Sequence, residues 1–396
     1  MIESNVDGHA RWQSALMDNY GTPDLTLVRG NGPYVWDADG GTYLDLVSGI
    51  AVNALGHAHP AVVAAVTEQI GLLGHTSNLY INQPAVELAD ALLDVAGLTG
   101  NGKVLFCNSG AEANEAAFKL TRLTGRNKVI ACDGAFHGRT MGSLSLTGQP
   151  PKSAPFQPLV PGVTHIPYGD TGALRSAVDS DTAAVFLEPL LGEGGVIPAP
   201  DGYLQAAREI TTAAGALLVL DEVQTGMGRL GSWFAFQQAG IVPDVFTLAK
   251  GLGGGLPLGA MIGVGTTADL LQPGQHGSTF GGNPVCCAAG LAVVRTIAAD
   301  KLCEHAAAVG KDIATGIEAL DHPLVTGVRG AGLLLGITLC EPVSKAVAAA
   351  AQHAGYLINP VAADVIRLAP PLIIEPEQAA EFVAALPAAL DAAKEN

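Results

Sequence analysis

The stretch ALLVLDEVQTGMGRLG, residues 216–231, begins with five apolar residues and continues directly into two acids, Asp221 and Glu222. A short unbroken apolar run of this kind predicts a strand that is buried on both faces. A charge at the end of such a strand is costly unless it has a partner. We therefore predict a core strand at Leu217–Leu220 that brings a carboxylate to a site where something pairs with it.

Similar apolar runs recur along the chain and alternate with helical patterns. The predicted strands are Lys103–Cys107, Lys128–Cys132, Ala183–Leu187, Leu217–Leu220 and Val245–Leu248, and the predicted helices include Ala61–Leu72, Pro84–Val95, Glu112–Leu123 and Tyr203–Ala213. This alternation is typical of an α/β protein whose mostly parallel sheet is covered by helices on both faces. Ligands of such sheets bind beyond the carboxyl ends of the strands, so the residues after each strand are the candidates for a site.

The alternating pattern does not cover the whole chain. Residues 1–59 are mixed in pattern, and after Pro284 a helical run is expected to extend to about Leu320. Strand-like segments then follow at Leu333–Thr338 and Val365–Leu368, before a closing helix at Pro376–Lys394. We expect a large domain at residues 60–284 and a smaller α+β domain made of residues 285–396 together with the N-terminal segment, residues 1–59.

Composition limits the classes of partner. The 396 residues are 48% hydrophobic and carry a formal net charge of −17. This charge disfavours non-specific binding to nucleic acid or to an anionic membrane, because both require a basic surface. The six cysteines lack zinc-binding spacing, which predicts reduced thiols in a cytoplasmic protein without a bound metal. The N-terminus has no signal-peptide pattern, and no apolar run reaches the length of a membrane helix.

The segment after Lys103–Cys107 has the features of an anion site. Ser109 followed by Glu112 is the spacing of a capping box and predicts the start of a helix. The backbone N–H groups of Gly110 and Ala111 would lie in its first turn, where they could bind phosphate. An ordinary helix cap remains the alternative interpretation.

Two further loops carry groups that can recognise a ligand. Phe136 could stack on a flat ring, and Arg139 could bind a carboxylate through two hydrogen bonds. Glu193 lies between glycines in the loop after Ala183–Leu187. A buried Phe136, a solvated Arg139 and a solvated Glu193 are the simpler alternatives.

Lys250 follows the apolar strand Val245–Leu248 and precedes the loop GLGGG. A desolvated lysine has a lowered pKa and can attack carbonyl groups, although a surface lysine is the commoner case. The loop does not have the glycine spacing of a dinucleotide site or of a Walker A motif. Farther along, Ser278 and Thr279 precede a helix start at Asn283 and Pro284, and their hydroxyls could bind phosphate or only cap a turn.

Together these groups lie at one rim of one sheet: a phosphate site, an aromatic ring, a carboxylate and a lysine. A cofactor with a phosphate, a flat ring, a ring nitrogen and an aldehyde would use all four. Pyridoxal 5′-phosphate has these features.

Six motifs occur in order between residues 108 and 284: NSGAEANE, AFHGRT, EPLLGEGG, LDEVQTGMGR, LAKGLGGGLPLGA and GSTFGGNP. They resemble the motifs of the class III pyridoxal-phosphate aminotransferases. The resemblance implies the type I fold of pyridoxal-phosphate enzymes and a homodimer with shared active sites. It implies that Lys250 holds the cofactor as an internal aldimine, and that Asp221 faces the cationic pyridine nitrogen.

The resemblance also implies roles for the other matched positions. The cofactor would be bound by Ser109, Gly110, Ala111, Phe136, Glu222, Val223, Gln224 and, from the partner subunit, Thr279. Arg139 and Ser278 would bind the substrate. Glu193 and Arg367 would form a switch, in which Arg367 binds the carboxylate of glutamate or 2-oxoglutarate and Glu193 neutralises Arg367 for the other substrate.

The nearest likeness is to the acetylornithine-using members of the family. It implies transfer of the δ-amino group of N2-acetyl-L-ornithine to 2-oxoglutarate, giving N-acetyl-L-glutamate 5-semialdehyde and L-glutamate in arginine biosynthesis. Donors such as succinylornithine, ornithine, 4-aminobutyrate and succinyl-diaminopimelate remain alternatives, because motifs that bind the cofactor do not select the amine. An aminomutase and a non-catalytic relative are further alternatives.

Overall fold

The computed structural model describes residues 2–394 and has an α/β architecture built on a sheet of seven strands. The strands are β4 (Gly102–Cys107), β5 (Lys128–Cys132), β6 (Val163–Ile166), β7 (Thr182–Leu187), β10 (Leu217–Asp221), β11 (Val245–Leu248) and β12 (Gly259–Val264). Their order is β4-β12-β11-β10-β7-β5-β6. Only β12 among them runs antiparallel to its neighbours, so the prediction of a mostly parallel sheet is confirmed.

The central strands are buried along their length. Every residue of β7, β11 and β12 is buried, as expected where helices cover both faces of a sheet. The five predicted strands occur within one residue of their predicted bounds. The strands β6 and β12 were not predicted. In β12, Gly259 approaches the backbone of Ser109 so closely that a Cβ atom would lie 2.4 Å from its carbonyl oxygen.

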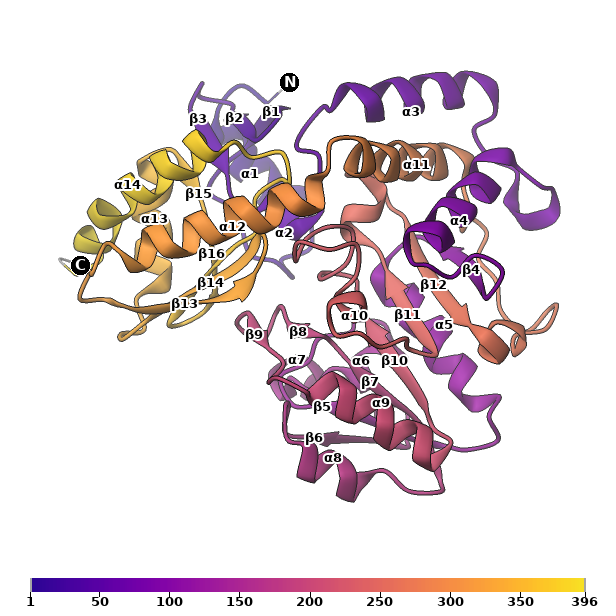
Figure 1. Cartoon of the computed structure of the whole chain (residues 1–396). Helices are drawn as coiled ribbons and strands as arrows, with labels where there is room; N and C mark the ends of the chain where they lie inside the picture. Colours follow the sequence, from indigo (N-terminus) through magenta and orange to yellow (C-terminus); the bar gives the residue numbers. More distant parts are fainter. Residues whose placement is uncertain (1, 395–396) are drawn as a thin grey trace.

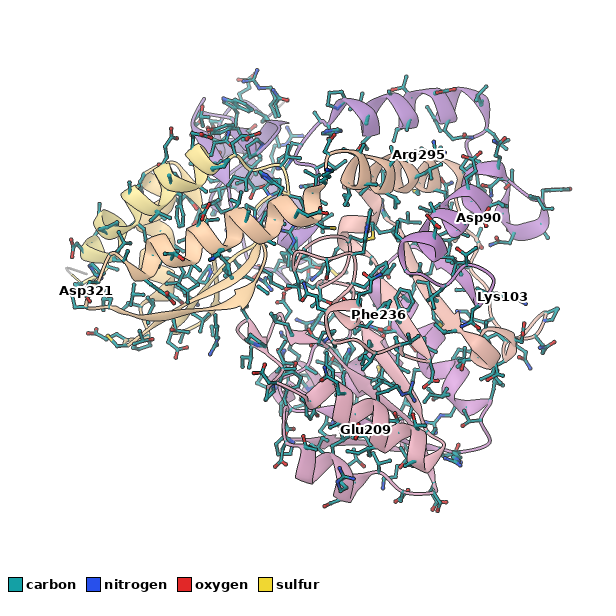
Figure 2. The ribbon with its side chains drawn as sticks, viewed as in Figure 1. Asp90, Lys103, Glu209, Phe236, Arg295 and Asp321 are labelled. Carbon is teal, nitrogen blue, oxygen red and sulfur yellow. The ribbon has the colours of Figure 1, made fainter. Side chains whose placement is uncertain are left out.

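Helices pack on both faces of this sheet (Figure 1). They are α3 (Pro60–Leu72), α4 (Gln83–Val95), α5 (Gly110–Arg122), α6 (Met141–Leu146), α7 (Pro150–Ser153), α8 (Thr171–Ala177), α9 (Tyr203–Ala214), α10 (Ala235–Gln238) and α11 (Pro284–Ala299). Phe236 of α10 lies in the interior, and its ring is 5.3 Å from that of Phe234 and 5.1 Å from that of Phe246. Figure 2 shows Phe236 in the middle of the molecule, whereas Lys103, Glu209 and Asp321 lie at its periphery.

A second group of elements lies to one side of the large sheet (Figure 1). It contains a sheet ordered β13-β14-β17-β16 and the helices α12 (Leu302–Glu318), α13 (Ser344–His353) and α14 (Pro376–Ala392). The strands of that sheet are β13 (Val325–Ala331), β14 (Leu334–Leu339), β16 (Asn359–Ala362) and β17 (Val365–Leu368).

The N-terminal segment joins this second group through a separate small sheet. Its strands are β1 (Leu27–Asn31), β2 (Tyr34–Asp37), β3 (Thr42–Asp45) and β15 (Tyr356–Leu357), preceded by α1 (Asn5–Ala15). β15 pairs with β3 in parallel and so connects segments more than 300 residues apart. The proposed domain boundaries at 59/60 and 284/285 stay predictions, and residues 1, 395 and 396 lie outside the described part. α11, which begins at Pro284, packs against α3 and α4.

The expected helical run to about Leu320 is wrong in one respect, because it forms two helices. α11 ends at Ala299 and α12 begins at Leu302. Lys301 between them has a φ of 52°, a left-handed conformation that a continuous helix does not contain. The break lets α12 pack against β13 instead of continuing along α3. Within residues 2–394, no helix is both long enough and apolar enough to cross a membrane.

Candidate active site

A cavity of about 420 Å³ opens at the carboxyl ends of the parallel strands β5, β7, β10 and β11. This volume lies in the range of small-molecule sites. The structure brings ten of the predicted site residues into its lining: Ser109, Gly110, Ala111, Phe136, Arg139, Glu193, Asp221, Val223, Gln224 and Lys250.

One wall of the cavity is the first turn of α5. Ser109 is the N-cap, and its hydroxyl accepts a hydrogen bond from the N–H of Glu112 at 3.1 Å. The first N–H groups of a helix have no partner within it, so those of Gly110 and Ala111 are available to an anion. Glycine is required at 110, since a Cβ atom there would lie 2.8 Å from a methyl carbon of Val223.

The predicted capping box forms only in part. The carboxylate of Glu112 accepts its hydrogen bond from the N–H of Asn108, at 2.6 Å, and not from the N-cap residue. The same carboxylate also accepts from the side-chain amide of Asn108. Asn108 is thereby fixed beside the cavity, which it lines.

Asp221, the last residue of β10, is 4% exposed and its carboxylate is held from three sides. One oxygen, Oδ2, bonds to Asn114 Nδ2 at 2.7 Å and to His137 Nδ1 at 2.8 Å. Among the described residues, the other oxygen, Oδ1, accepts a hydrogen bond only from the N–H of Val223, at 3.0 Å. An oxygen has room for two donors, so Oδ1 can still accept a hydrogen bond from a ligand in the cavity.

His137 is buried beneath Asp221, and its Nε2 has no hydrogen-bond partner among the described residues. Burial lowers the pKa of His137, but the hydrogen bond and the negative charge of Asp221 outweigh it and hold the pKa above its ordinary value. Asn114 completes the support, since its amide also donates to the carbonyl of His137 and its Oδ1 accepts from Thr247.

Lys250 lies at the start of a 3-10 turn directly after β11, with a φ of 43°. A non-glycine residue in this conformation costs on the order of 1–3 kcal/mol, which is typical of functional sites. Within residues 2–394 its amine has no hydrogen-bond or ion-pair partner. Burial lowers its pKa to about 8, and the positive charge of Arg367 contributes. Its amine is therefore far more nucleophilic at neutral pH than that of a surface lysine.

The ring of Phe136 forms part of a cationic wall. The charged groups of Lys152 and Arg139 lie 4.8 and 5.6 Å from its centroid. Arg139 is exposed and forms no ion pair with the described residues, so its guanidinium can bind a substrate carboxylate.

Glu193 and Arg367 form an ion pair, although Glu193 lies in a turn after β7 and Arg367 lies on β17 of the second group of elements. Nη1 of Arg367 lies 2.5 Å from Oε1 of Glu193 and 3.2 Å from Oε1 of Gln224. Arg367 itself is 2% exposed. Burial raises the pKa of Glu193, but the charges of Arg367 and Lys250 outweigh it and keep the pKa below its ordinary value. The carboxylate is therefore ionised and free to move only if another anion replaces it.

Glu188 joins two of the loops that form the cavity. One carboxylate oxygen accepts the N–H of Phe136 at 2.7 Å, and the other accepts the N–H of Gly192 at 3.1 Å. Burial raises its pKa to about 7. The side chain thus fixes the aromatic ring relative to the loop that carries Glu193.

Four predicted site residues are not among those that line the cavity, and one of them, Arg367, reaches it through Glu193 and Gln224, which line it. Glu222 is fully buried on the other side of the chain, where its carboxylate accepts from Thr225 Oγ1 and from the N–H of Phe236. Its position next to Asp221 in sequence suggested a shared role, but successive residues of a strand point to opposite faces. Ser278 is bonded to Asn108 at 3.0 Å, and Thr279 is exposed on the same loop.

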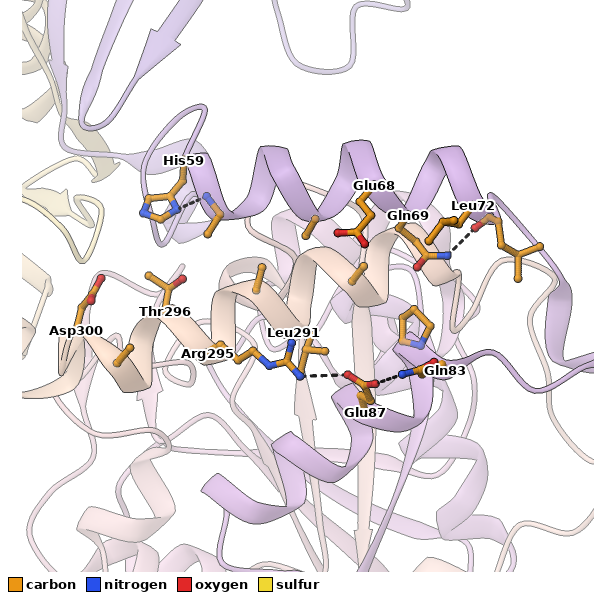
Figure 3. A pocket seen from close by; sticks show the side chains of 17 residues that line it. His59, Glu68, Gln69, Leu72, Gln83, Glu87, Leu291, Arg295, Thr296 and Asp300 are labelled. Carbon is orange, nitrogen blue, oxygen red and sulfur yellow. Dashed lines mark hydrogen bonds and ion pairs between the residues drawn. The ribbon is translucent and has the colours of Figure 1, made fainter.

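A larger cavity, of about 950 Å³, lies between α3, α4 and α11, far from the carboxyl ends of the strands (Figure 3). Of its charged groups, Glu87 bonds to Arg295 at 3.1 Å and to Gln83. The smaller cavity is the one that combines a helix N-terminus, a lysine and carboxylates at the carboxyl ends of strands.

The family model for class III aminotransferases matches residues 16–390. The chain belongs to the class III aminotransferases. It is 63% identical over 387 residues to the acetylornithine aminotransferase of Mycolicibacterium smegmatis, and the match covers 98% of this chain and 99% of that protein. It is 61% identical over 394 residues to the acetylornithine aminotransferase of Streptomyces coelicolor, with coverage of 99% and 98%.

Solved structures of this family have the same fold. An ornithine aminotransferase from Toxoplasma gondii superimposes with a TM-score of 0.95 at 31% identity, covering 100% of this chain and 96% of that one. An acetylornithine aminotransferase from Elizabethkingia anophelis superimposes with a TM-score of 0.88 at 35% identity, covering 98% and 99%.

Sequence reasoning missed several residues of this aminotransferase site. Asn114, His137 and Glu188 lie within the quoted motifs, but no role was predicted for them from the sequence. A signal for His137 existed, because it sits between two predicted site residues, Phe136 and Arg139. No local pattern could indicate that Asn114, one turn inside a helix, reaches Asp221.

Proposed function

We propose that this class III aminotransferase uses pyridoxal 5′-phosphate to transfer the δ-amino group of N2-acetyl-L-ornithine to 2-oxoglutarate. The products are N-acetyl-L-glutamate 5-semialdehyde and L-glutamate, as in arginine biosynthesis. The relatives at 63% and 61% identity, both named acetylornithine aminotransferases, support this choice of donor.

The residues of the cavity fit pyridoxal phosphate. The free N–H groups of the α5 N-terminus suit its phosphate, and the free lone pair of Asp221 Oδ1 suits a protonated ring nitrogen. Phe136 and Val223 would contact the two faces of the ring, with Gln224 at its edge. When bound, the cofactor supplies an aldehyde that condenses with amines and a ring that accepts the electrons left when a C–H bond breaks.

The protein's own groups provide the acid–base chemistry. Lys250 would bind the cofactor aldehyde, and as a general base it would take the proton from the δ-carbon of the donor. Its lowered pKa suits a group that must both accept and release a proton near neutral pH. Asp221, fixed by Asn114 and His137, would keep its negative charge against the ring nitrogen.

The Glu193–Arg367 ion pair is the observation that carries the choice of reaction. The two substrates of the proposed reaction each have a carboxylate at one end and differ at the other end. At that other end 2-oxoglutarate has a second carboxylate and N2-acetyl-L-ornithine has none. The site must therefore accept both a dicarboxylate and a monocarboxylate. With Glu193 on Arg367 the pair is neutral, and with Glu193 displaced Arg367 can bind a carboxylate. Arg139 and Ser278 would bind the α-carboxylate of the acetylated donor.

We further propose a cytoplasmic homodimer in which Thr279 of the partner subunit contributes to the phosphate site. Thr279 and Phe280 are exposed in the single chain, and the loop at 281 is bonded to Asn78. Next to it, Leu79, Tyr80 and Ile81 are exposed, Ile81 by 89%. A patch of this kind marks an interface with another protein surface. All six cysteines are free thiols, in accord with a reducing compartment.

A panel of ω-amine donors with 2-oxoglutarate as acceptor tests the proposed substrate. We expect kcat/KM for N2-acetyl-L-ornithine to exceed that for ornithine, 4-aminobutyrate and succinyl-diaminopimelate by at least about tenfold. A higher value for any of these donors would refute the assignment. Turnover of an amino aldehyde without a 2-oxo acid would indicate an aminomutase instead.

Complementation between two inactive variants tests the shared site. Lys250→Ala removes the nucleophile, and Thr279→Asp places a negative charge against the partner's phosphate site. Co-expression of the two should restore about one quarter of wild-type activity, because one site of each mixed dimer is then intact. A mixture that stays inactive, or a wild type that is monomeric in solution, would contradict the shared site.

A further inference from the structure

Asn359 is the residue that ties Arg367 to its own sheet. It lies on β16 and pairs directly with Arg367 of β17 across the antiparallel ladder. Side chains of such cross-strand neighbours lie on the same face and within contact. Oδ1 of Asn359 accepts a hydrogen bond from Nη2 of Arg367 at 2.9 Å.

The two other partners of Arg367 come from loops beyond the large sheet. Glu193 lies in the turn between β8 (Leu190–Leu191) and β9 (Ile197–Pro198), and Gln224 follows β10. Both bond to Nη1 of Arg367, whereas Asn359 bonds to Nη2. On the other side of β17, the residue opposite Arg367 is Gly336, which has no side chain to offer. Within residues 2–394, Asn359 is therefore the side chain that holds the second nitrogen.

This division of partners has a different consequence for each half of the reaction. While a donor that has no carboxylate near Arg367 is bound, Glu193 stays on Nη1 and the guanidinium is fixed at both nitrogens. When a dicarboxylate binds, Glu193 is displaced and its hydrogen bond to Nη1 is lost. Bidentate recognition of a carboxylate depends on the orientation of the planar guanidinium, which Asn359 then has to maintain.

We propose that Asn359 is a positioning residue that fixes Arg367 for dicarboxylate substrates and so determines the affinity of the site for 2-oxoglutarate and glutamate. The inference rests on the proposed function, in which Arg367 alternates between Glu193 and a substrate carboxylate. It adds a residue outside the cavity lining that acts on only one of the two substrates.

The test compares Asn359→Ala with wild-type holoenzyme in both half-reactions. Loss of a hydrogen bond to a charged group predicts a KM for 2-oxoglutarate that rises about tenfold, and the same for glutamate in reverse. The KM for the amine donor should stay within about twofold, because Glu193 still fixes Nη1 in that half. Calorimetric titration with glutarate, a dicarboxylate that cannot react, should show a dissociation constant about tenfold higher.

Two further variants make the result specific. Asn359→Asp keeps an acceptor for Nη2 but adds a permanent negative charge beside Arg367. It too should weaken the binding of glutarate and leave the KM for the amine donor unchanged. Thr338→Ala is the matched control, since Thr338 lies on the adjacent strand β14 and bonds to the carbonyl of Gly327. It should change neither KM, and a change in both would show that the sheet rather than Asn359 is responsible.

Equal increases in both KM values, or an unchanged affinity for glutarate, would overturn the role of Asn359. If Asn359→Ala does not fold, the same two comparisons made with Asn359→Asp decide the question. Failure of the proposed function has a different signature. Wild-type enzyme would then prefer another ω-amine donor, and the selective effect of Asn359 on 2-oxoglutarate would be measured with that donor.

Discussion

His137 and Asp221 form a buried pair in which Nδ1 of the imidazole lies 2.8 Å from Oδ2 of the carboxylate. The pair helps to fix Oδ2, whereas Oδ1 accepts the N–H of Val223 and keeps room for a second donor. Replacing His137 with phenylalanine leaves Oδ2 with Asn114 alone and should lower kcat about tenfold and weaken the binding of pyridoxal phosphate. His165→Phe is the control, because His165 bonds only to the backbone of Leu146. Unchanged kcat and cofactor affinity in His137→Phe would contradict this role.

The same pair predicts how stability depends on pH. The folded-state pKa of His137 lies above its ordinary value, so folding favours the protonated imidazole. The stabilisation is fully present below the unfolded pKa of about 6.5 and is lost as the pH rises through the folded value. Urea unfolding of the protein without cofactor should therefore show a larger advantage of wild type over His137→Phe at about pH 6 than at about pH 9. A stability difference between wild type and His137→Phe that grows with pH would contradict this prediction.

Capture of pyridoxal phosphate should follow the ionisation of Lys250. With a pKa of about 8, about a tenth of the amine is neutral at pH 7, compared with well under a thousandth for an ordinary lysine. The rate of cofactor capture by the apoenzyme, followed by absorbance, should rise with pH and level off above about 8. A rate that still rises steeply above about pH 10 would show an ordinary surface lysine.

The charge of Glu193 should favour the amine donor. In Glu193→Gln, Arg367 is left buried with an uncompensated charge, so the KM for N2-acetyl-L-ornithine should rise about tenfold. The KM for 2-oxoglutarate should stay constant or fall, because no carboxylate has to be displaced. Glu209→Gln, on the exposed face of α9, is the control for loss of one acid. A rise in KM for 2-oxoglutarate alone would contradict the proposed switch.

The sequence predicted the elements whose signals are local. β5 and β11 were predicted with their exact bounds, because each is a short and largely apolar segment, KVIAC and VFTL. β12 was missed because its run contains two glycines, and what makes it a strand is its pairing with β4 and β11. The break between α11 and α12 depends on the packing of α12 against β13, which no window of sequence contains.

The same distinction holds for the site. Residues that directly follow strands, such as Asp221 and Lys250, could be assigned to one cavity because parallel strands end at one edge. Asn359 could not, because its relation to Arg367 depends on the register of β16 against β17. Glu222 was misplaced because residues adjacent in sequence point to opposite faces of a strand.

The covalent bond between Lys250 and the cofactor is the central claim, and peptide mapping tests it most directly. Purified enzyme incubated with pyridoxal phosphate is reduced with borohydride, digested and analysed by mass spectrometry. We predict one pyridoxyl phosphate group per chain, located on Lys250, and none on the Lys250→Ala protein. A label on another lysine, or a wild-type protein that takes up no label, would contradict the claim.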